Sequence, residues 1–359
     1  MLGSDIMADK GKDKNLVVNA NLDEKDEIVW YDADKPPFSI YGAYSTVPYK
    51  RIDLELAKAA NDGVVFHHGN PSGVRARFRT NSPYIAVHAE WNEQEKYPSL
   101  TDIACCGFDL YTYNRGSRLQ TYKGSLMPQP DSPKGFDHIC YCDGVMTDYV
   151  LNFPLYNNLT NLLIGVKRGS EFEETEKYFN DLPVVFYGSS ITQGCSASRP
   201  GNNYINILSR ELNLDTVNLG FSGSARAEDS MVKYLSEQKM SAFVCDYDHN
   251  APNVEHLEKT HYKIYDTVRT KHPDLPYIML TKPDYKRDEG DDLRRVVVMK
   301  TFIKAIERGD KNVYFVDGAS LFRGHRFMDC TIDGCHPNDL GFNYFAEALY
   351  PVLYRIFYK

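Results

Sequence analysis

The sequence predicts two domains of different class: an antiparallel β-sandwich in the first half and an α/β domain with a five-stranded parallel sheet in the second. Short alternating strands broken by turn residues fill the chain up to about residue 175. From about residue 180, apolar β-branched runs alternate with amphipathic segments. We therefore expect a disordered tail or vector-derived scar over 1–20, a jelly-roll-like sandwich over 21–175 and the α/β domain over 180–359.

The first half shows the two-residue period of half-buried strands. In GVRARFRTNSPYIAVHAEW (73–91), apolar residues alternate with arginines, Asn-Ser-Pro at 81–83 marks a turn, and the alternation then resumes. This pattern predicts a hairpin-like pair of strands. Further strands are expected in 107–114, 138–144 and 149–166, and hardly any segment here carries the spacing of an amphipathic helix.

The second half predicts a doubly wound sheet. Buried strands are expected at 183–188, 215–220, 241–247, 276–281 and 312–318. Helices are expected near 202–212, 228–239, 254–271, 292–308 and 339–356. Strands that alternate with helices in this way form an open parallel sheet with helices on both faces. Ligands of such sheets bind beyond the carboxyl ends of the strands.

Composition limits the classes of function. The 359 residues carry a net charge of −8, which disfavours a nucleic-acid binder, and no apolar stretch approaches the ~20 residues of a membrane span. The polar start lacks the apolar segment of a secretory signal, so we expect a cytoplasmic protein unless a signal has been removed.

Cysteine and aromatic content favour structural roles. The eight cysteines lack the spacing of a zinc site, so we expect buried, reduced thiols, with Cys140 and Cys142 as a metal pair the weaker alternative. The 26 tyrosines and 18 phenylalanines suit β-rich cores, although rings of this kind also form platforms for sugars. Trp30 and Trp91 are expected in the core.

The segment FYGSSITQG (186–194) raises the possibility of a serine nucleophile at the end of the first parallel strand. A serine hydroxyl needs an adjacent base, which a third group must orient. DGCHPNDLGF (333–342), just before the last helix, supplies Asp333 and His336 three residues apart. A carboxylate at this spacing can reach round a turn to the imidazole Nδ1, which leaves Nε2 to face a serine.

Two further loops carry candidate oxyanion donors. NLGFSGSAR (218–226) follows the second strand and offers backbone N–H groups, with Gly223 favoured over Gly220. DYDHNAPN (246–253) follows the third strand and places Asn250 at the same sheet edge, where its amide donates an N–H or else satisfies backbone groups of its own loop. Four segments thus carry parts of an acyl-transfer site.

On these four segments the sequence resembles the SGNH (GDSL-type) hydrolases, which have a flavodoxin-like α/β fold. The resemblance implies that Ser190 is the nucleophile, His336 the base and Asp333 its orienting carboxylate. It implies an oxyanion hole made of the Ser190 N–H, the Gly223 N–H and the Asn250 side chain. It implies no metal or organic cofactor.

The resemblance extends to the first half and has one departure. GFDLY (107–111) matches the Gly-x-Asp-Leu-Tyr signature of a β-sandwich domain found in one branch of these enzymes, and GVRARFRTNS fits the same domain. The family usually has Asp before the nucleophile, where this chain has Ser189, which we expect to tie down its loop. Enzymes of this plan are often carbohydrate deacetylases, some of them in intracellular mannan or xylan degradation.

The resemblance therefore implies a serine esterase that removes O-acetyl groups from mannan- or xylan-type oligo- or polysaccharides. A short-chain lipid or acyl-thioester esterase is the first alternative, disfavoured by the lack of a long apolar lid segment. A sugar-binding protein with a degenerate hydrolase half is the second. The expected partner is a small-molecule or oligosaccharide ester, with neither nucleic acid nor membrane, and a homodimer stays open.

Three other features have structural interpretations. Cys195 is expected to be a buried thiol. His67-His68 is expected in a surface loop, with a loop folded over the active site as the alternative. The charged run KRDEGDD (286–292) is expected to be a solvated loop.

Overall fold

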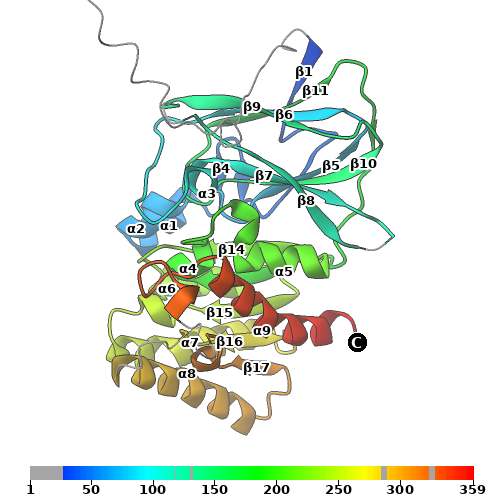
Figure 1. Cartoon of the computed structure of the whole chain (residues 1–359). Coiled ribbons are helices and arrows are strands. Elements are labelled where there is room, and N and C mark those ends of the chain that lie inside the picture. Colours follow the sequence, from blue (N-terminus) through cyan, green and yellow to red (C-terminus); the bar gives the residue numbers. More distant parts are fainter. Residues whose placement is uncertain (1–26, 117, 130–131, 284–288, 323–327) are drawn as a thin grey trace, which may run out of the picture.

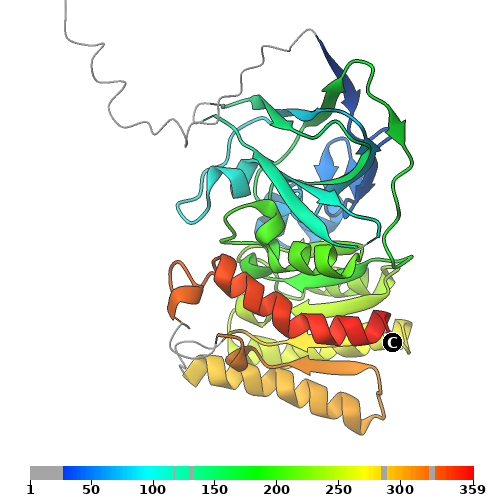
Figure 2. The same cartoon turned by 45° about the vertical axis from the view of Figure 1, so that its right-hand side comes forward.

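The computed structural model describes residues 27–116, 118–129, 132–283, 289–322 and 328–359. Figures 1 and 2 show the antiparallel sheets stacked on the α/β domain, with α9 crossing the front of the latter. The expected N-terminal tail lies outside the described residues. In the described part of the chain, the strands of the antiparallel sheets fall within 28–173 and those of the parallel sheet within 184–316.

The first half forms two antiparallel sheets. The four-stranded sheet has the order β1 (Ile28–Asp32), β11 (Asn161–Lys167), β6 (Tyr84–Glu90), β9 (Gly135–Tyr141). The six-stranded sheet has the order β12 (Phe172–Glu173), β5 (Arg75–Thr80), β10 (Thr147–Asn152), β7 (Phe108–Tyr113), β8 (Gln120–Leu126), with β2 (Ser39–Tyr41) also on β5. A short pair, β3 (Ser45–Thr46) and β4 (Tyr49–Lys50), stands apart. Apolar side chains of both larger sheets share one core, which confirms the predicted antiparallel β-domain.

The predicted hairpin at 73–91 is wrong. β5 pairs with β10, β2 and β12, whereas β6 pairs with β11 and β9 in the other sheet. Residues 81–83 therefore carry the chain across the sandwich. The period of two identifies a strand and its faces, but it contains no information about the strand's partner.

The first half also contains three short helices that the pattern did not predict. These are α1 (Leu54–Ala60), α2 (Asp62–His67) and α3 (Asp102–Cys106). Asp53, Asn61 and Thr101 cap their N-termini with side-chain oxygens. They are too short for a helical period to stand out. Ala57 and Val64, from α1 and α2, belong to the apolar core of the α/β domain.

The second half forms the predicted parallel sheet, with strand order β14-β13-β15-β16-β17. The strands are β13 (Val184–Gly188), β14 (Thr216–Gly220), β15 (Ala242–Asp246), β16 (Tyr277–Leu280) and β17 (Val313–Val316). The helices are α4 (Ser190–Gln193), α5 (Tyr204–Leu212), α6 (Asp229–Glu237), α7 (Val254–Lys271), α8 (Glu289–Glu307) and α9 (Asp339–Phe357). The chain reverses its winding direction between β13 and β15, where this class of sheet binds ligands.

Alternate side chains of the strands divide the core into two layers. Phe186 of β13 packs with residues of α5 and α9 and with the sandwich core, whereas Val185 packs with α6, α7 and α8. Helices therefore cover both faces, as predicted. Because one apolar cluster runs from the sandwich into the α5–α9 layer, the two halves share a continuous core.

The structure also bears on the charged run, on the cysteines and on a membrane-spanning helix. The charged run 286–292 is not a loop throughout, because α8 begins at Glu289, while 286–288 lie outside the described residues. Six of the eight cysteines are buried, and Cys142 and Cys335 are partly so. Cys140 and Cys142 are free thiols. Among the described residues, no helix combines the length and apolarity needed to cross a membrane.

Candidate active site

Ser190 begins α4 directly after β13. Ser189 is the N-cap, and its hydroxyl accepts a hydrogen bond from the Ile191 N–H at 3.1 Å. Gly188 permits the tight turn, because a Cβ there would lie 2.3 Å from the Asp246 carbonyl oxygen on the neighbouring strand. The Ser190 side chain therefore emerges at the carboxyl edge of the sheet, where it retains 8% exposure.

The last loop brings an imidazole and a carboxylate to Ser190. The Ser190 Oγ lies 3.0 Å from His336 Nε2, and His336 Nδ1 lies 2.7 Å from Asp333 Oδ2. Asp333 Oδ1 also accepts the backbone N–H groups of His336 and Cys335. Burial alone would raise the pKa of Asp333, but these hydrogen bonds outweigh burial and hold the pKa below its usual value. Asp333 is thus a carboxylate that fixes the imidazole with Nε2 facing the hydroxyl.

Hydrogen bonds occupy most of the backbone donors at the start of the loop after β14, but not the Gly223 N–H. The Gly220 N–H is taken by Asn218 Oδ1, the Phe221 N–H by the Gly188 carbonyl and the Ser222 N–H by Gln193 Oε1. The Ser224 N–H returns to the Phe221 carbonyl. No acceptor for the Gly223 N–H is found in the described part of the chain. Gly223 is also exposed, and a Cβ on it would meet nothing within 4 Å, whereas one on Gly220 would lie 2.2 Å from Gln193 N.

Asn250 lies in the loop after β15. Its Oδ1 is 3.4 Å from the Ala225 N–H, which belongs to the loop after β14. The other end of the amide, Nδ2, has no acceptor among the described residues. The Ser190 N–H is in the first turn of α4, where helical N–H groups lack an intrahelical acceptor. In the described part of the chain, the Ser190 N–H, the Gly223 N–H and the Asn250 Nδ2 are therefore uncommitted, and they follow three adjacent strands, β13, β14 and β15.

Buried polar side chains that the motifs did not single out support this arrangement. The Tyr156 hydroxyl of the sandwich domain donates to the Ser190 carbonyl at 3.3 Å. Thr192 and Tyr204 both donate to Asp246 Oδ2, at 2.9 and 3.0 Å. Burial, with the nearby charge of Asp248, raises the pKa of Asp246 well above its usual value. These contacts join α4 to β15 and to the sandwich, over sequence separations that no local motif reveals.

The expectation of a surface loop at His67-His68 is wrong for His67. This ring ends α2, is 7% exposed, and its Nδ1 lies 2.8 Å from Asn70 Oδ1. Burial lowers the pKa of His67 to about 4, so the ring is neutral at pH 7. Asn70 in turn accepts a hydrogen bond from Gln193 of α4. His67 and Asn70 are therefore buried near Gln193 of α4, whereas His68 is half-buried.

Cys195 and Trp91 have the structural positions expected of them. Cys195 is buried, 3.0 Å from the Ser196 hydroxyl and 3.5 Å from the Ser99 hydroxyl. Trp91 is in the sandwich core, where its Nε1 donates to the Ser132 carbonyl. Trp30 is partly buried at the edge of a smaller apolar cluster.

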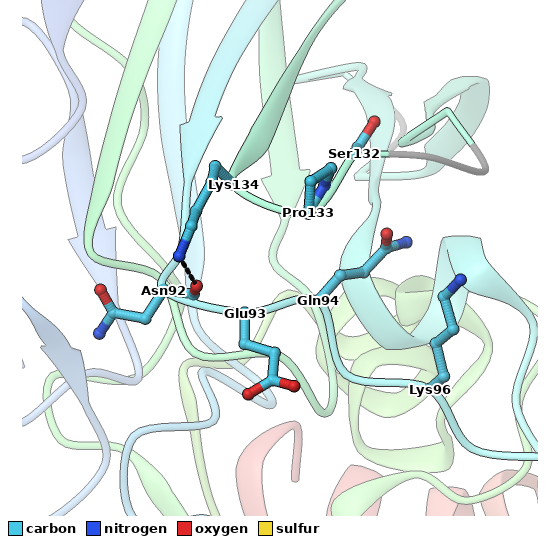
Figure 3. A pocket seen from close by; sticks show the side chains of 7 residues that line it. All are labelled: Asn92, Glu93, Gln94, Lys96, Ser132, Pro133 and Lys134. Atoms are coloured by element: carbon cyan, nitrogen blue, oxygen red, sulfur yellow. Dashed lines mark hydrogen bonds between the residues drawn. The ribbon is translucent and has the colours of Figure 1, made fainter.

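A cavity of about 530 Å³ lies in the sandwich domain at some distance along the chain from the serine (Figure 3). It is lined by Asn92, Glu93, Gln94, Lys96, Ser132, Pro133 and Lys134. Segment 92–101 leads from this cavity to residues 195–198, which follow α4. There the Ser99 hydroxyl meets Cys195, and the Thr101 hydroxyl donates to the Ser198 carbonyl at 2.6 Å. The sandwich domain therefore contacts the segment that follows α4.

Family models match both halves of the chain. Residues 181–354 match the GDSL-like lipase/acylhydrolase family, and residues 28–172 match the N-terminal domain of SGNH-hydrolase-type esterases, named GxDLY. A search of the curated proteins finds no match.

Solved structures resemble the chain over nearly its full length. A protein from Bacteroides ovatus named as a GDSL-like lipase is 27% identical, with a TM-score of 0.82, covering 92% of this chain and 98% of its own. The salicylyl-acyltransferase SsfX3 of a tetracycline biosynthetic pathway is 18% identical, with a TM-score of 0.74 and coverage of 92% and 97%. An acetyl xylan esterase from Butyrivibrio proteoclasticus is 14% identical, with a TM-score of 0.57 and coverage of 91% and 98%.

The last two identities establish a shared fold alone, whereas the family models cover the two domains in the order found here. The parallel sheet and the serine at its carboxyl edge fall in the first matched region, and the two antiparallel sheets fall in the second. Residues 181–354 belong to the GDSL-like lipase/acylhydrolase family, residues 28–172 form a GxDLY domain, and the chain is an SGNH-type esterase.

Proposed function

We propose that this esterase removes O-acetyl groups from oligo- or polysaccharides, with Ser190 as nucleophile, His336 as general base and Asp333 as the orienting carboxylate. One observation carries the assignment of the site. The three side chains form a continuous hydrogen-bonded series, with distances of 3.0 and 2.7 Å, that ends at a serine in the first turn of α4. That geometry is the requirement for acyl transfer through a serine.

The proposed reaction proceeds through an acyl-enzyme. The Ser190 Oγ attacks the ester carbonyl carbon while His336 Nε2 takes the hydroxyl proton, and Asp333 stabilises the resulting imidazolium. The oxyanion accepts hydrogen bonds from the Ser190 N–H, the Gly223 N–H and the Asn250 Nδ2. His336 then protonates the departing alcohol oxygen as the ester C–O bond breaks. Water, deprotonated by His336, then attacks the acyl carbon. His336 returns that proton to the Ser190 Oγ as the acyl C–Oγ bond breaks, which releases acetate and restores the Ser190 hydroxyl.

The surroundings of the site support a polar alcohol as the leaving group. Segment 92–101 joins the nucleophile turn to a cavity lined mainly by amide and charged side chains, a lining that suits hydroxyl groups better than a lipid chain (Figure 3). The fold is shared with a protein named as an acetyl xylan esterase, which adds support by analogy. An acetylated sugar chain that extends along segment 92–101 would place its ester at Ser190.

The test is acetate release from acetylated manno- and xylo-oligosaccharides, with Ser190→Ala beside wild type. Ser198→Ala is the matched control, since this exposed serine bonds to Asp339 and not to His336. We expect Ser190→Ala to abolish release and Ser198→Ala to retain it. An aryl ester series should show activity that falls steeply beyond acetyl.

Other outcomes identify the alternatives. Preference for longer acyl chains or acyl-thioesters would overturn the acetyl-sugar substrate and keep the site. Turnover that survives in Ser190→Ala would overturn the site. Sugar binding without turnover of any ester would overturn the enzymatic assignment of this chain.

A further inference from the structure

We propose that Gln193 is a positioning residue through which the sandwich domain holds the oxyanion loop, defined as Phe221–Ser224, in its working geometry. The inference rests on the proposed function of Ser190 and Gly223. Gln193 is fully buried and comes from α4, three residues after Ser190. It is the side chain that joins the nucleophile helix, the oxyanion loop and the sandwich domain.

The first contact fixes the peptide next to Gly223. Gln193 Oε1 accepts the Ser222 N–H at 3.0 Å. This bond sets the plane of the Phe221–Ser222 peptide. The Gly223 N–H belongs to the next peptide, so fixing the first one leaves only the φ and ψ of Ser222 to vary its direction. Gly223 has φ +65, and a Cβ placed on it would meet no atom within 4 Å. Packing around its Cα therefore does little to restrain the Gly223 backbone. Without the Gln193 acceptor, the Ser222 N–H would lose its partner. The loop would keep the Ser224-to-Phe221 turn bond, the entry bonds at Gly220 and Phe221, and the bond from Asn61 Nδ2 to the Ser224 carbonyl.

The second set of contacts ties Gln193 to the sandwich domain. Gln193 Nε2 donates to Asn70 Oδ1 at 3.1 Å and to the Leu155 carbonyl at 3.3 Å. Asn70 Nδ2 donates to the Tyr156 carbonyl at 2.7 Å, so the Asn70 oxygen must face Gln193. Because Gln193 Nε2 faces two oxygens, its Oε1 must face Ser222. The network admits one orientation of each amide.

A buried arginine of the same domain holds the strand that feeds the loop. One Arg51 amino group donates to the Asn218 carbonyl at 3.1 Å and to the Gly220 carbonyl at 2.5 Å. The guanidinium also lies over the Phe221 ring, 4.8 Å from its centroid. The oxyanion loop is therefore held on its entry side by Arg51 and at its centre by Gln193. Both clamps depend on residues before position 160 of the chain.

The role predicts a particular kinetic signature. The oxyanion loop bonds to the substrate oxygen most strongly in the transition state, so loosening it lowers kcat and leaves KM nearly unchanged. Complete loss of one oxyanion donor costs ~10²–10³ in kcat, and a donor that is mobile rather than absent should cost about 10- to 100-fold. A boronic acid forms a tetrahedral adduct with a nucleophilic serine and so mimics the intermediate. Its affinity for the variant enzyme should fall by a similar factor.

The experiment compares Gln193→Met and Asn70→Ala with wild type, using an aryl acetate and a boronic acid. Gln193→Met keeps the side-chain volume and removes the acceptor for Ser222, whereas Asn70→Ala removes the sandwich-side partner without altering the hydrolase domain. Asp215→Asn is the control, because it weakens a domain contact to Arg75 at the opposite, amino end of β14. Melting temperature is measured for all variants.

We expect Gln193→Met to lower kcat about 10- to 100-fold and to weaken boronate binding in parallel, with KM within about twofold. Asn70→Ala should also lower kcat and weaken boronate binding at nearly constant KM, but by a smaller factor. If Gln193→Met does not fold, the kinetics of Asn70→Ala test the proposal. Asp215→Asn should lower the melting temperature and keep kcat. Unchanged kcat and boronate affinity in folded variants, or losses that follow melting temperature across all three, would overturn the proposal.

The wild type and Ser190→Ala separate this inference from the proposed function. Wild-type turnover that disappears in Ser190→Ala, together with full activity of Gln193→Met and Asn70→Ala, overturns the role of Gln193 alone. A wild type that hydrolyses no ester overturns both.

Discussion

Single side chains decide which donors are available at the serine edge of the sheet. After β14, the N–H groups of residues 220, 221 and 222 donate to Asn218, Gly188 and Gln193, respectively. The next N–H, that of Gly223, has no acceptor in the described part of the chain. Spacing along the sequence favoured Gly223 over Gly220, and the hydrogen bonds explain the preference physically. The Gly220 N–H is already bonded to Asn218, and a Cβ on Gly220 would lie 2.2 Å from Gln193 N of α4. Gly220 therefore has neither a donor nor space for a substrate oxygen.

Asn250→Ala tests the third donor at the residue scale. Removing the amide should lower kcat by ~10²–10³, because the oxyanion loses a preorganised donor that mobile water replaces poorly. Steady-state kinetics on an aryl acetate measure the effect. Asn250→Asp serves as the companion variant: it keeps the oxygen that faces the Ala225 N–H and replaces the donor with an acceptor, so it should be at least as impaired. Near-wild-type kcat in Asn250→Ala would exclude Asn250 from the oxyanion hole.

At the scale of elements, the turn from β13 into α4 is held by more contacts than its sequence motif suggests. The Ser189 hydroxyl caps α4, and Thr192 bonds to Asp246 at the end of the neighbouring strand. Ser189 stands where the family usually has Asp, and its hydroxyl supplies the cap to the N–H of Ile191. A hydroxyl can do so without placing another carboxylate near the buried Asp246, whose pKa is already raised.

The packing of α7 against α8 predicts a pH dependence of stability. His261 of α7 is buried against Thr301 of α8, 2.9 Å away, and burial lowers its pKa to about 4. In the unfolded chain the ring titrates near pH 6.5. As the pH falls from about 6.5 to about 4, His261 becomes protonated in the unfolded state but stays neutral in the folded state. The free energy of unfolding that this histidine contributes is therefore fully present above pH 6.5 and is lost progressively down to about pH 4.

His261→Gln should remove this contribution. It should cost stability at pH 7 through lost packing, but the gap to wild type should narrow as pH falls to about 4, by up to about 3 kcal/mol. Urea unfolding at a series of pH values measures the gap. A gap that stays constant from pH 7 to pH 4 would show that His261 does not couple protonation to folding.

At the scale of the whole molecule, the two halves are joined by a buried polar interface as well as an apolar one. Arg75 and Arg77 of β5 alternate with apolar residues and yet are fully buried, because they point at the α/β domain rather than at water. Arg75 bonds to Asp215 at 2.6 Å and to the Tyr178 hydroxyl at 2.6 Å. The Arg77 guanidinium lies over the Tyr178 ring, 4.3 Å from its centroid.

Arg75→Met tests that interface. The substitution leaves Asp215 without its cation and breaks bonds to the Gly73 and Thr216 carbonyls, so we expect a loss of roughly 3–5 kcal/mol in the free energy of unfolding. Denaturant unfolding measures it, with Lys58→Met on the exposed face of α1 as a control expected to stay within about 0.5 kcal/mol. A loss below about 1 kcal/mol would show that the ion pair contributes little to joining the domains.

The sequence by itself determined the class of both domains and the five parallel strands with their helices, and it predicted which residues lie at the sheet edge. It could do so because each strand carries its own apolar period, and because parallel strands place their carboxyl ends, with the segments around Ser190, Gly223 and Asn250, at one edge. The joining of those residues into a working site remains the proposal that the variants above test.

Only the tertiary structure decided which strands pair in the sandwich, why two arginines of β5 are buried, and how Gln193 is held. The contact between Asn70 and Gln193 spans 123 positions, and that between Arg51 and Gly220 spans 169. No local period encodes such a pairing, because a polar side chain looks the same in sequence whether it meets water or a distant amide. Burial of these groups becomes favourable only when both partners arrive together, and that condition belongs to the folded chain.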